Sequence, residues 1–297
     1  MGKLDRRGGG ALVLLGAALW GTAGVASRWI HEAGTAGAVD IGFWRLALAV
    51  PVLLLLSRAL AGPLPGLERI PLLRLAGMGL ALAAFQYCYF GAIAAVGVAV
   101  ATLIGICSIP IAVALLAVPL YGERLGRTGM LALGVAVVGT TALILGAHDP
   151  ELPGARGMLV GIPLALGACL SFALLTLAGR GVSAEVHPLW TTSVTCAVGS
   201  VLLGLGVLAF GPSLPDPAAG TWWILAWIAL LPTALAYVLF YTGVRAIPSR
   251  LAGILILGEP LTATLGARLL HGESLTTLGW LGAVLLGLAM LLMARRQ

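Results

Sequence analysis

Charged side chains are scarce in this 297-residue sequence: Asp, Glu, Lys and Arg make up 9% of it, whereas a soluble domain carries about 25%. Hydrophobic residues make up 60%. A soluble fold cannot bury so large an apolar surface, so a soluble globular protein is excluded and a polytopic membrane protein is predicted. The 42 glycines suit this class, because small residues let membrane helices approach closely.

Residues for metal, redox and nucleotide chemistry are also few. The four cysteines lie inside apolar stretches without metal-ligand spacing, and we expect free, buried thiols. The four histidines lie at span ends or in connections, and no phosphate-binding loop is present. The sequence therefore predicts no metal, no cofactor and no catalytic constellation, and we expect a protein that binds and gates rather than an enzyme. The net charge of +6 is scattered over short connections, which indicates membrane orientation rather than nucleic-acid binding.

Apolar stretches of spanning length predict an all-α membrane protein with ten transmembrane helices. The expected spans are 10–30, 38–57, 71–91, 97–120, 128–146, 157–178, 188–210, 221–244, 251–270 and 277–294. The first residues run straight into an apolar stretch without a small-residue cleavage site, so we expect a first span and not a removed signal.

The distribution of Lys and Arg between alternate connections predicts the orientation. Thirteen of them fall on one side of the membrane and three on the other, or four if Arg45 is included. Positive residues concentrate in cytoplasmic connections, so both chain ends are expected in the cytoplasm and the protein in the inner (plasma) membrane. Two ends on one side require an even number of spans, which agrees with ten.

The chain carries an internal duplication. With an offset of 150 residues, 106–131 matches 256–281 at ten of twenty-six positions. The identical pairs include Pro110 with Pro260 and Glu123 with Glu273. Each copy holds five spans, an odd number, so the second copy must be inverted in the membrane, as in many secondary transporters. We expect the first repeat over 1–150 and the second over 151–297.

Each half carries the same motif, a proline followed by a Gly-Glu-x-Leu sequence. The first copy runs from Pro110 to Gly122-Glu123-Arg124-Leu125, and the second runs from Pro260 to Gly272-Glu273-Ser274-Leu275. Together with five-span halves and the aromatic-Arg motif Phe43-Trp44-Arg45, the chain resembles the drug/metabolite transporter superfamily, in particular its ten-span EamA-type exporters. Within them, amino-acid exporters of the YddG type are the nearest group.

The resemblance implies a secondary transporter that exports small metabolites by alternating access, with amino acids as the first expectation. A drug or organic-cation exporter and a nucleobase exporter are alternatives within the same fold. A membrane-embedded enzyme is a remote alternative, since it would need convergent ionisable residues at one membrane level. The expected partners are a small-molecule substrate and the lipid bilayer, with proton coupling open, and the expected state is a monomer or weak dimer.

Glu259 is the one clear carboxyl at mid-depth of an expected span, followed directly by Pro260. Such a residue is costly in the membrane and marks a functional site by default. We hypothesise that Glu259 binds a substrate ammonium or takes up a proton, with Thr262 on the same face. A proline also loosens the helix one turn before it. The structural alternative is a protonated or Arg-paired carboxyl that caps the bend at Pro260. Its repeat mate is Ile109, and this asymmetry favours function.

Polar aromatic residues are predicted to line a cavity between spans 1, 3, 4, 6, 8 and 9. Tyr237 and Tyr241 are spaced i and i+4, as are their mates Phe85 and Tyr89 in the first repeat. Gln86 flanks the first-repeat pair, and Trp20 lies near the middle of span 1. We expect Trp20, Gln86, Tyr89, Tyr237 and Tyr241 to contact substrate; interhelical packing or an interfacial aromatic belt is the alternative.

Symmetric glycines and prolines are expected to act as hinges: Gly105 and Pro110 in span 4, and Gly258 and Pro260 in span 9. Static kinks are the alternative.

Three further charged residues are expected to have structural rather than functional roles. Arg45 could bind a carboxylate or form a gate, but the favoured expectation is that it reaches the headgroups or pairs with Asp40. Glu123 and Glu273 are expected to be structural, at the starts of the following helices.

Overall fold

The computed structural model describes residues 5–32, 38–63, 71–122, 126–147, 155–210, 220–271 and 276–294. Within these ranges the chain is helical and no strand is present. The first-half helices are α1 (Arg6–Glu32), α2 (Ala38–Leu60), α3 (Leu72–Gly105), α4 (Ile109–Tyr121) and α5 (Arg127–Ala147). The second-half elements are α6 (Ala155–Glu185), α7 (Pro188–Phe210), α8 (Thr221–Ala229), the π-helical turn η3 (Leu230–Leu235), α9 (Ala236–Val244), α10 (Ser249–Leu255), α11 (Gly258–His271) and α12 (Thr277–Ala294).

Helix α3 joins two of the expected spans. Its 34 residues would extend about 50 Å if straight, which exceeds the hydrocarbon layer of about 30 Å. The Tyr89 hydroxyl nevertheless lies 2.8 Å from the hydroxyl of Thr102, thirteen residues further along. A straight helix would hold these residues about 20 Å apart, beyond the reach of a tyrosine side chain. The α3 ribbon therefore folds back on itself between Tyr89 and Thr102, where spans 3 and 4 were expected to separate.

The remaining expected spans correspond closely to described helices. The span over 221–244 is formed by α8, η3 and α9 in series, and the span over 251–270 by α10 and α11. Five described helical segments are long and apolar enough to cross a membrane: Asp40–Leu60, Leu72–Ile93, Arg156–Val182, Pro188–Ala209 and Thr221–Val244. Shorter apolar helices cover Ile109–Tyr121, Gly129–Leu143 and Thr277–Ala289.

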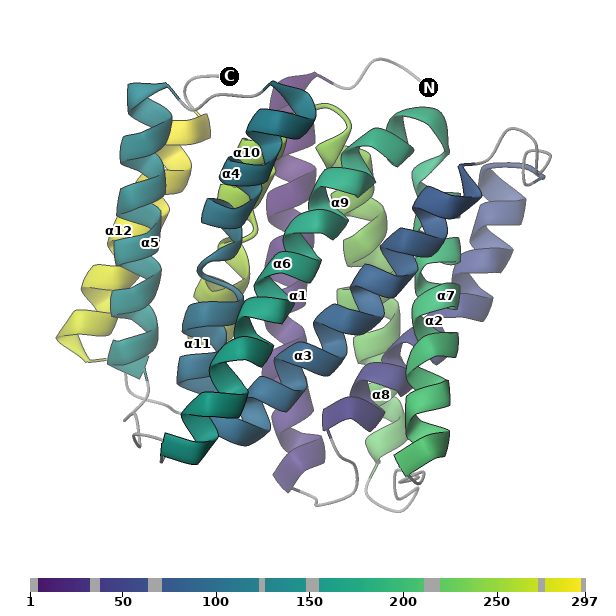
Figure 1. Cartoon of the computed structure of the whole chain (residues 1–297), viewed down its shortest axis with the longest axis horizontal. Coiled ribbons are helices and arrows are strands. Elements are labelled where there is room, and N and C mark those ends of the chain that lie inside the picture. Colours follow the sequence, from purple (N-terminus) through teal and green to yellow (C-terminus); the bar gives the residue numbers. More distant parts are fainter. Residues whose placement is uncertain are drawn as a thin grey trace.

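The two halves run in opposite directions. In Figure 1, α1 begins at the upper end of the view and α6 begins at the lower end, while α12 ends at the upper end. The helix contacts show the same relation: exchanging the halves turns the contact of α1 with α9 into that of α6 with α3. The contacts of α5 with α12 and of α2 with α7 each join a helix to its own repeat mate. The fold is therefore a bundle of ten membrane segments arranged as two inverted five-segment repeats. The exact boundary near residue 150 lies outside the described residues and stays a prediction.

Glycines on α1 set its position between α9 and α11. A methyl group added at Gly16 would lie 2.8 Å from the carbonyl oxygen of Ala236, and one at Gly21 would lie 2.6 Å from the carbonyl oxygen of Glu259. On the periphery, Gly139 and Gly282 hold α5 and α12 in backbone contact in the same way. Close backbone approach through small residues is the usual basis of helix association in membranes.

Spans 4 and 9 are interrupted at corresponding positions. Helix α3 ends at Gly105 and α4 begins at Ile109, while α10 ends at Leu255 and α11 begins at Gly258. The helix is interrupted one turn before Pro260, where the disturbance was expected, but the interruption separates two helices instead of bending a continuous one. Pro260 lies in the first turn of a new helix, where its missing N–H leaves no bond unmade.

The two interrupted spans cross near these breaks, since a methyl group at Gly253 would lie 3.3 Å from the Cα atom of Pro110. Gly122, from the sequence motif, ends α4 in the left-handed conformation (φ 64°), which glycine adopts without strain. Glu123 and Glu273, expected at helix starts, lie outside the described residues.

Candidate functional site

Aromatic rings from four helices meet in the centre of the bundle. Trp20 of α1 lies 5.5 Å from Phe172 of α6 and 5.0 Å from Tyr237 of α9, measured between ring centroids. Phe85 of α3 lies 4.8 Å from Phe172 and stacks on Tyr89 at 5.6 Å. The expected i, i+4 pairs therefore do share faces, and their helices are those predicted to surround a cavity. In this conformation the rings pack against one another across the centre.

Glu259 occupies the second position of α11, directly after the break in span 9. This position lies at the helix N-terminus, where unpaired backbone N–H groups favour a negative charge. Its side chain is partly buried. One turn on, the Thr262 hydroxyl lies 3.1 Å from the Ala18 carbonyl of α1 and 3.0 Å from the Glu259 carbonyl. Thr262 therefore ties the Glu259 turn to α1, near Trp20.

The Glu259 carboxylate interacts electrostatically with groups from both repeats. Its charge acts on Tyr89 and Cys107 of the first half and on Tyr237 of the second, and the charge of Arg45 acts on Glu259. Four residues that are far apart in the sequence thus lie around one carboxyl group. No set of three His, Cys, Asp or Glu side chains within the described ranges could hold a metal ion.

Arg45 points into the protein. Its Nε donates a hydrogen bond of 3.0 Å to the Thr233 hydroxyl in η3, and the side chain is partly buried. The favoured expectation, that Arg45 reaches the headgroups or pairs with Asp40, is not what the structure shows. The reason is the π-helical turn, which presents an acceptor to α2 at this level.

Of the predicted substrate contacts, Trp20, Tyr89, Tyr237, Glu259 and Thr262 come together as described above. Trp20 is 5% exposed, and its buried indole Nε1 has no hydrogen-bond partner among the described residues. An N–H group in that state is available to a ligand acceptor. Whether these side chains bind substrate stays a prediction.

The other two predicted contacts, Gln86 and Tyr241, are also buried. The Gln86 Nε2 and the Tyr241 hydroxyl have no hydrogen-bond partner among the described residues. The Cβ atom of Gln86 lies near α2, since a methyl group added at Gly42 would lie 3.8 Å from it. Tyr241 packs on α6, where Gly179 leaves room for its ring. Tyr241 also stacks on Tyr237, with 5.9 Å between the ring centroids, so the substrate contacts of Gln86 and Tyr241 stay predictions as well.

A family model decides the class of this chain. The model of the EamA-like transporter family matches it twice, over residues 7–145 and 159–295. The chain belongs to the EamA-like transporter family. Both matches together span nearly the whole sequence, and each corresponds to one five-segment half. The chain is therefore a multi-pass membrane transporter.

Relatives and a solved structure agree with the family. The chain is 31% identical to an uncharacterized transporter, YwfM, of Bacillus subtilis over 292 residues, which cover 95% of this chain and 92% of that one. It is 29% identical to the threonine/homoserine exporter RhtA of Salmonella typhimurium over 243 residues, 81% of this chain and 76% of the exporter. A crystal structure of a protein at 19% identity superposes with a TM-score of 0.80 over 96% of both chains and shows the same fold.

Residues that the sequence analysis passed over complete the centre of this EamA-like transporter. Phe172 contacts rings from α1, α3 and α9, and Phe240 lies 5.1 Å from Trp20. Phe172 directly follows Ser171, which corresponds to Trp20 at an offset of 151 residues. Phe240 is three residues beyond Tyr237, so spacing could have found both. Thr233 carried no such signal, because a π-helical turn is not visible in a hydropathy pattern.

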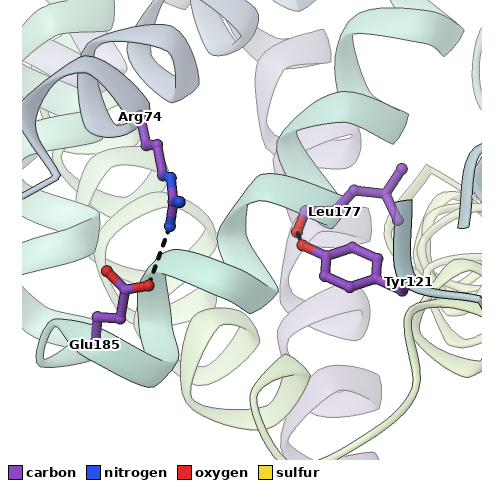
Figure 2. A network of polar contacts seen from close by, with 4 residues as sticks. All are labelled: Arg74, Tyr121, Leu177 and Glu185. Atoms are coloured by element: carbon purple, nitrogen blue, oxygen red, sulfur yellow. Dashed lines mark hydrogen bonds and ion pairs between the residues drawn. The ribbon is translucent and has the colours of Figure 1, made fainter. Parts of the chain in front are cut away.

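Polar contacts link the helices at the end of the bundle where α1 begins. The Tyr121 hydroxyl of α4 donates to the Leu177 carbonyl of α6 at 2.7 Å, and Arg74 of α3 pairs with Glu185 of α6 at 3.0 Å (Figure 2). The Arg180 guanidinium lies 5.1 Å from the centre of the Tyr121 ring. Helices α3, α4 and α6 are therefore in contact at this end.

Proposed function

We propose that this transporter exports small zwitterionic metabolites, amino acids first, across the inner membrane by alternating access, with both chain ends in the cytoplasm. The observation that carries the proposal is the Glu259 carboxylate at the break in span 9, within electrostatic range of Tyr89 and Tyr237. A carboxylate beside aromatic faces is a suitable partner for a substrate ammonium group. The likeness to a threonine/homoserine exporter supports the same substrate class.

Alternating access would use the breaks in spans 4 and 9. Gly105 ends α3 and Gly258 begins α11, so each lies beside a point where the helical hydrogen bonding is already interrupted. Rotation there disrupts few backbone bonds. Pro110 and Pro260 lie in the first turns of α4 and α11, which makes each half-helix start at a defined residue. We propose these four residues as the hinges of the transport cycle.

Proton coupling is the second part of the proposal. Glu259 can exchange a proton for a substrate ammonium, because either one neutralises its charge. Binding of substrate on one side and of a proton on the other would then link export to the inward proton gradient.

The experiment measures labelled threonine in proteoliposomes containing the purified full chain, with and without a pH gradient. Uracil and tetraphenylphosphonium are tested in parallel as probes of the nucleobase and organic-cation alternatives. We expect saturable threonine transport that a pH gradient accelerates. Glu259→Gln should abolish the acceleration and lower transport at least about tenfold, the loss of one charged hydrogen bond.

The matched control is Glu185→Gln, which removes a carboxylate that is 54% exposed at the end of α6. Its transport should equal that of the wild type. Transport of uracil or tetraphenylphosphonium without threonine would replace the proposed substrate class. Unchanged threonine transport and pH response in Glu259→Gln would remove Glu259 from the site. Tags on the two chain ends found on opposite sides of the membrane would contradict the orientation.

A further inference from the structure

Arg45 is a permanent charge inside an apolar helix. The α2 segment Asp40–Leu60 is otherwise apolar enough to cross the membrane, and Arg45 lies five residues after its start. A guanidinium at the bilayer centre costs about 2.5–3.5 kcal/mol by insertion scales, and one closer to the surface still needs polar partners. A charge at this depth persists where the surrounding structure gives it partners or where it has a function. The partner that the structure provides is the Thr233 hydroxyl, 3.0 Å from Nε.

The hydrogen bonding of Thr233 shows why it faces Arg45 as an acceptor. Pro232 has no backbone N–H, so in a regular helix the carbonyl of Ile228, four residues earlier, would lack its donor. The Thr233 hydroxyl donates to that carbonyl at 2.8 Å. A hydroxyl has a single proton, and with that proton used on Ile228 its lone pairs remain for the Arg45 Nε. The π-helical turn thus fixes one edge of the guanidinium.

Anchoring through Nε leaves the two terminal nitrogens of Arg45. No residue in the described ranges accepts a hydrogen bond from them. Two parallel N–H groups on a planar guanidinium are the donor pair that binds a carboxylate in a bidentate manner. A lysine could not reproduce this arrangement, since its ammonium is a point charge.

The opposite charge acts on the same aromatic residue as Arg45. Tyr237 feels the charges of both Arg45 and Glu259, and its ring contacts Trp20 at 5.0 Å. Arg45 comes from the first repeat and Glu259 from the second, so the two charges approach the centre from different halves. A cation and an anion that both act on one buried tyrosine match a ligand that carries both charges close together.

We propose that Arg45 binds the carboxylate of the transported zwitterion, held in position by Thr233, while Glu259 binds its ammonium group. This proposal rests on the proposed function and narrows it to substrates with a free carboxylate. The subsite distinguishes an amino acid from the corresponding amine or amide, which the Glu259 side alone cannot do.

The test compares L-threonine with L-threoninamide, in which a neutral amide replaces the carboxylate. Each is used as a competitor of labelled threonine uptake into proteoliposomes containing the full chain and preloaded with threonine. For the wild type we expect threoninamide to compete about 10- to 100-fold more weakly, the loss of a charge-assisted bidentate pair. In Arg45→Gln the two compounds should compete almost equally well, because the binding of threonine weakens and that of threoninamide does not.

Three variants separate the subsite from general damage. Arg58→Gln, on the same helix but exposed, should keep the wild-type ratio. Thr233→Val keeps the Arg45 charge and removes its anchor, so the ratio should fall about three- to tenfold. Glu259→Gln should weaken the binding of both competitors and leave the ratio of their inhibition constants unchanged.

The outcomes are distinct. A wild type that carries no threonine overturns the proposed function and this subsite together. A wild type that carries threonine, with an Arg45→Gln variant that still discriminates against threoninamide, overturns the subsite alone. If Arg45→Gln does not fold, an unchanged ratio in Thr233→Val overturns the subsite.

Discussion

Replacing Gly21 by alanine should push α1 away from α11 at the level of Glu259. The added methyl group would lie 2.6 Å from the Glu259 carbonyl oxygen, 2.7 Å from the Ala263 nitrogen and in close contact with the Thr262 hydroxyl. Two of these three atoms belong to the backbone, so a side-chain rotation cannot relieve the contact. The separation from the Glu259 oxygen must open to at least 3.4 Å, which requires a shift of one helix.

The cost can be worked out from the same contacts. Overpacking typically costs about 1–3 kcal/mol, and the shift also weakens the bond from Thr262 to Ala18, worth about 0.5–1.5 kcal/mol. Alanine recovers about 1 kcal/mol through its higher helix propensity. The net loss in the free energy of unfolding is therefore about 0.5–3.5 kcal/mol.

The matched control is Gly77→Ala on α3, where a methyl group would meet no atom within 4 Å. It should leave thermal stability equal or slightly raised, while Gly21→Ala lowers the melting temperature in detergent by several degrees. Threonine transport should fall in Gly21→Ala alone, because the Glu259 turn moves with α11. Equal melting temperatures for the two variants would refute the close packing of α1 on α11.

Three further perturbations test other parts of the fold. Tyr89→Phe and Thr102→Val each break the hydrogen bond between the two hydroxyls within α3, so each should lower the free energy of unfolding by about 0.5–1.5 kcal/mol. The double variant should lose no more than either single variant, which a double-mutant cycle of thermal-shift measurements can check. Burial, and then the Arg245 charge, lower the pKa of His187, whose ring nitrogen accepts a hydrogen bond from the Leu189 N–H. The unfolded chain then binds more protons than the folded one just below the usual histidine pKa of about 6.5, so the free energy of unfolding should rise with pH there. A His187→Gln variant that keeps this slope contradicts the assignment. Arg74→Gln should change stability by less than about 1 kcal/mol, because the ion pair with Glu185 is exposed, and a larger loss in chemical denaturation would show that this contact closes the bundle end.

Hydropathy and the duplicated motif were sufficient to predict the architecture. The span over 277–294 coincides with α12, and the spans over 188–210 and 128–146 match α7 and α5 to within a residue. The inverted repeat followed from counting five spans in each copy. Such patterns are readable because the lipid imposes one rule on every spanning segment.

Interruptions within spans were harder to predict. Pro110 and Pro260 indicated a disturbance, but a proline in the sequence is equally compatible with a bend inside a helix and with the start of a new one. The hydrogen bonds that distinguish the two involve neighbouring backbone atoms, such as the bond of 2.9 Å from the Glu259 N–H to the Ile256 carbonyl. The π-helical turn around Thr233 depends on the same local choice.

The candidate site was predictable in part. Trp20, Tyr89, Tyr237 and Glu259 stood out because each is unusual within its own span. Arg45 was assigned to the headgroups, since its distance from the span end suggested a reachable surface. The direction of its side chain depends on Thr233, which is 188 positions away in the sequence. Local sequence patterns do not reveal a contact between residues that far apart.

The crossing of α5 and α12 restricts how the two halves can move. At Gly139 and Gly282 the main chains touch, and there is no flexible side chain between them to absorb sliding. The aromatic centre, by contrast, joins its helices through rings that can turn about their own bonds. In the alternating access proposed above, the contact between α5 and α12 would then serve as the fixed axis, and displacement would grow with distance from it.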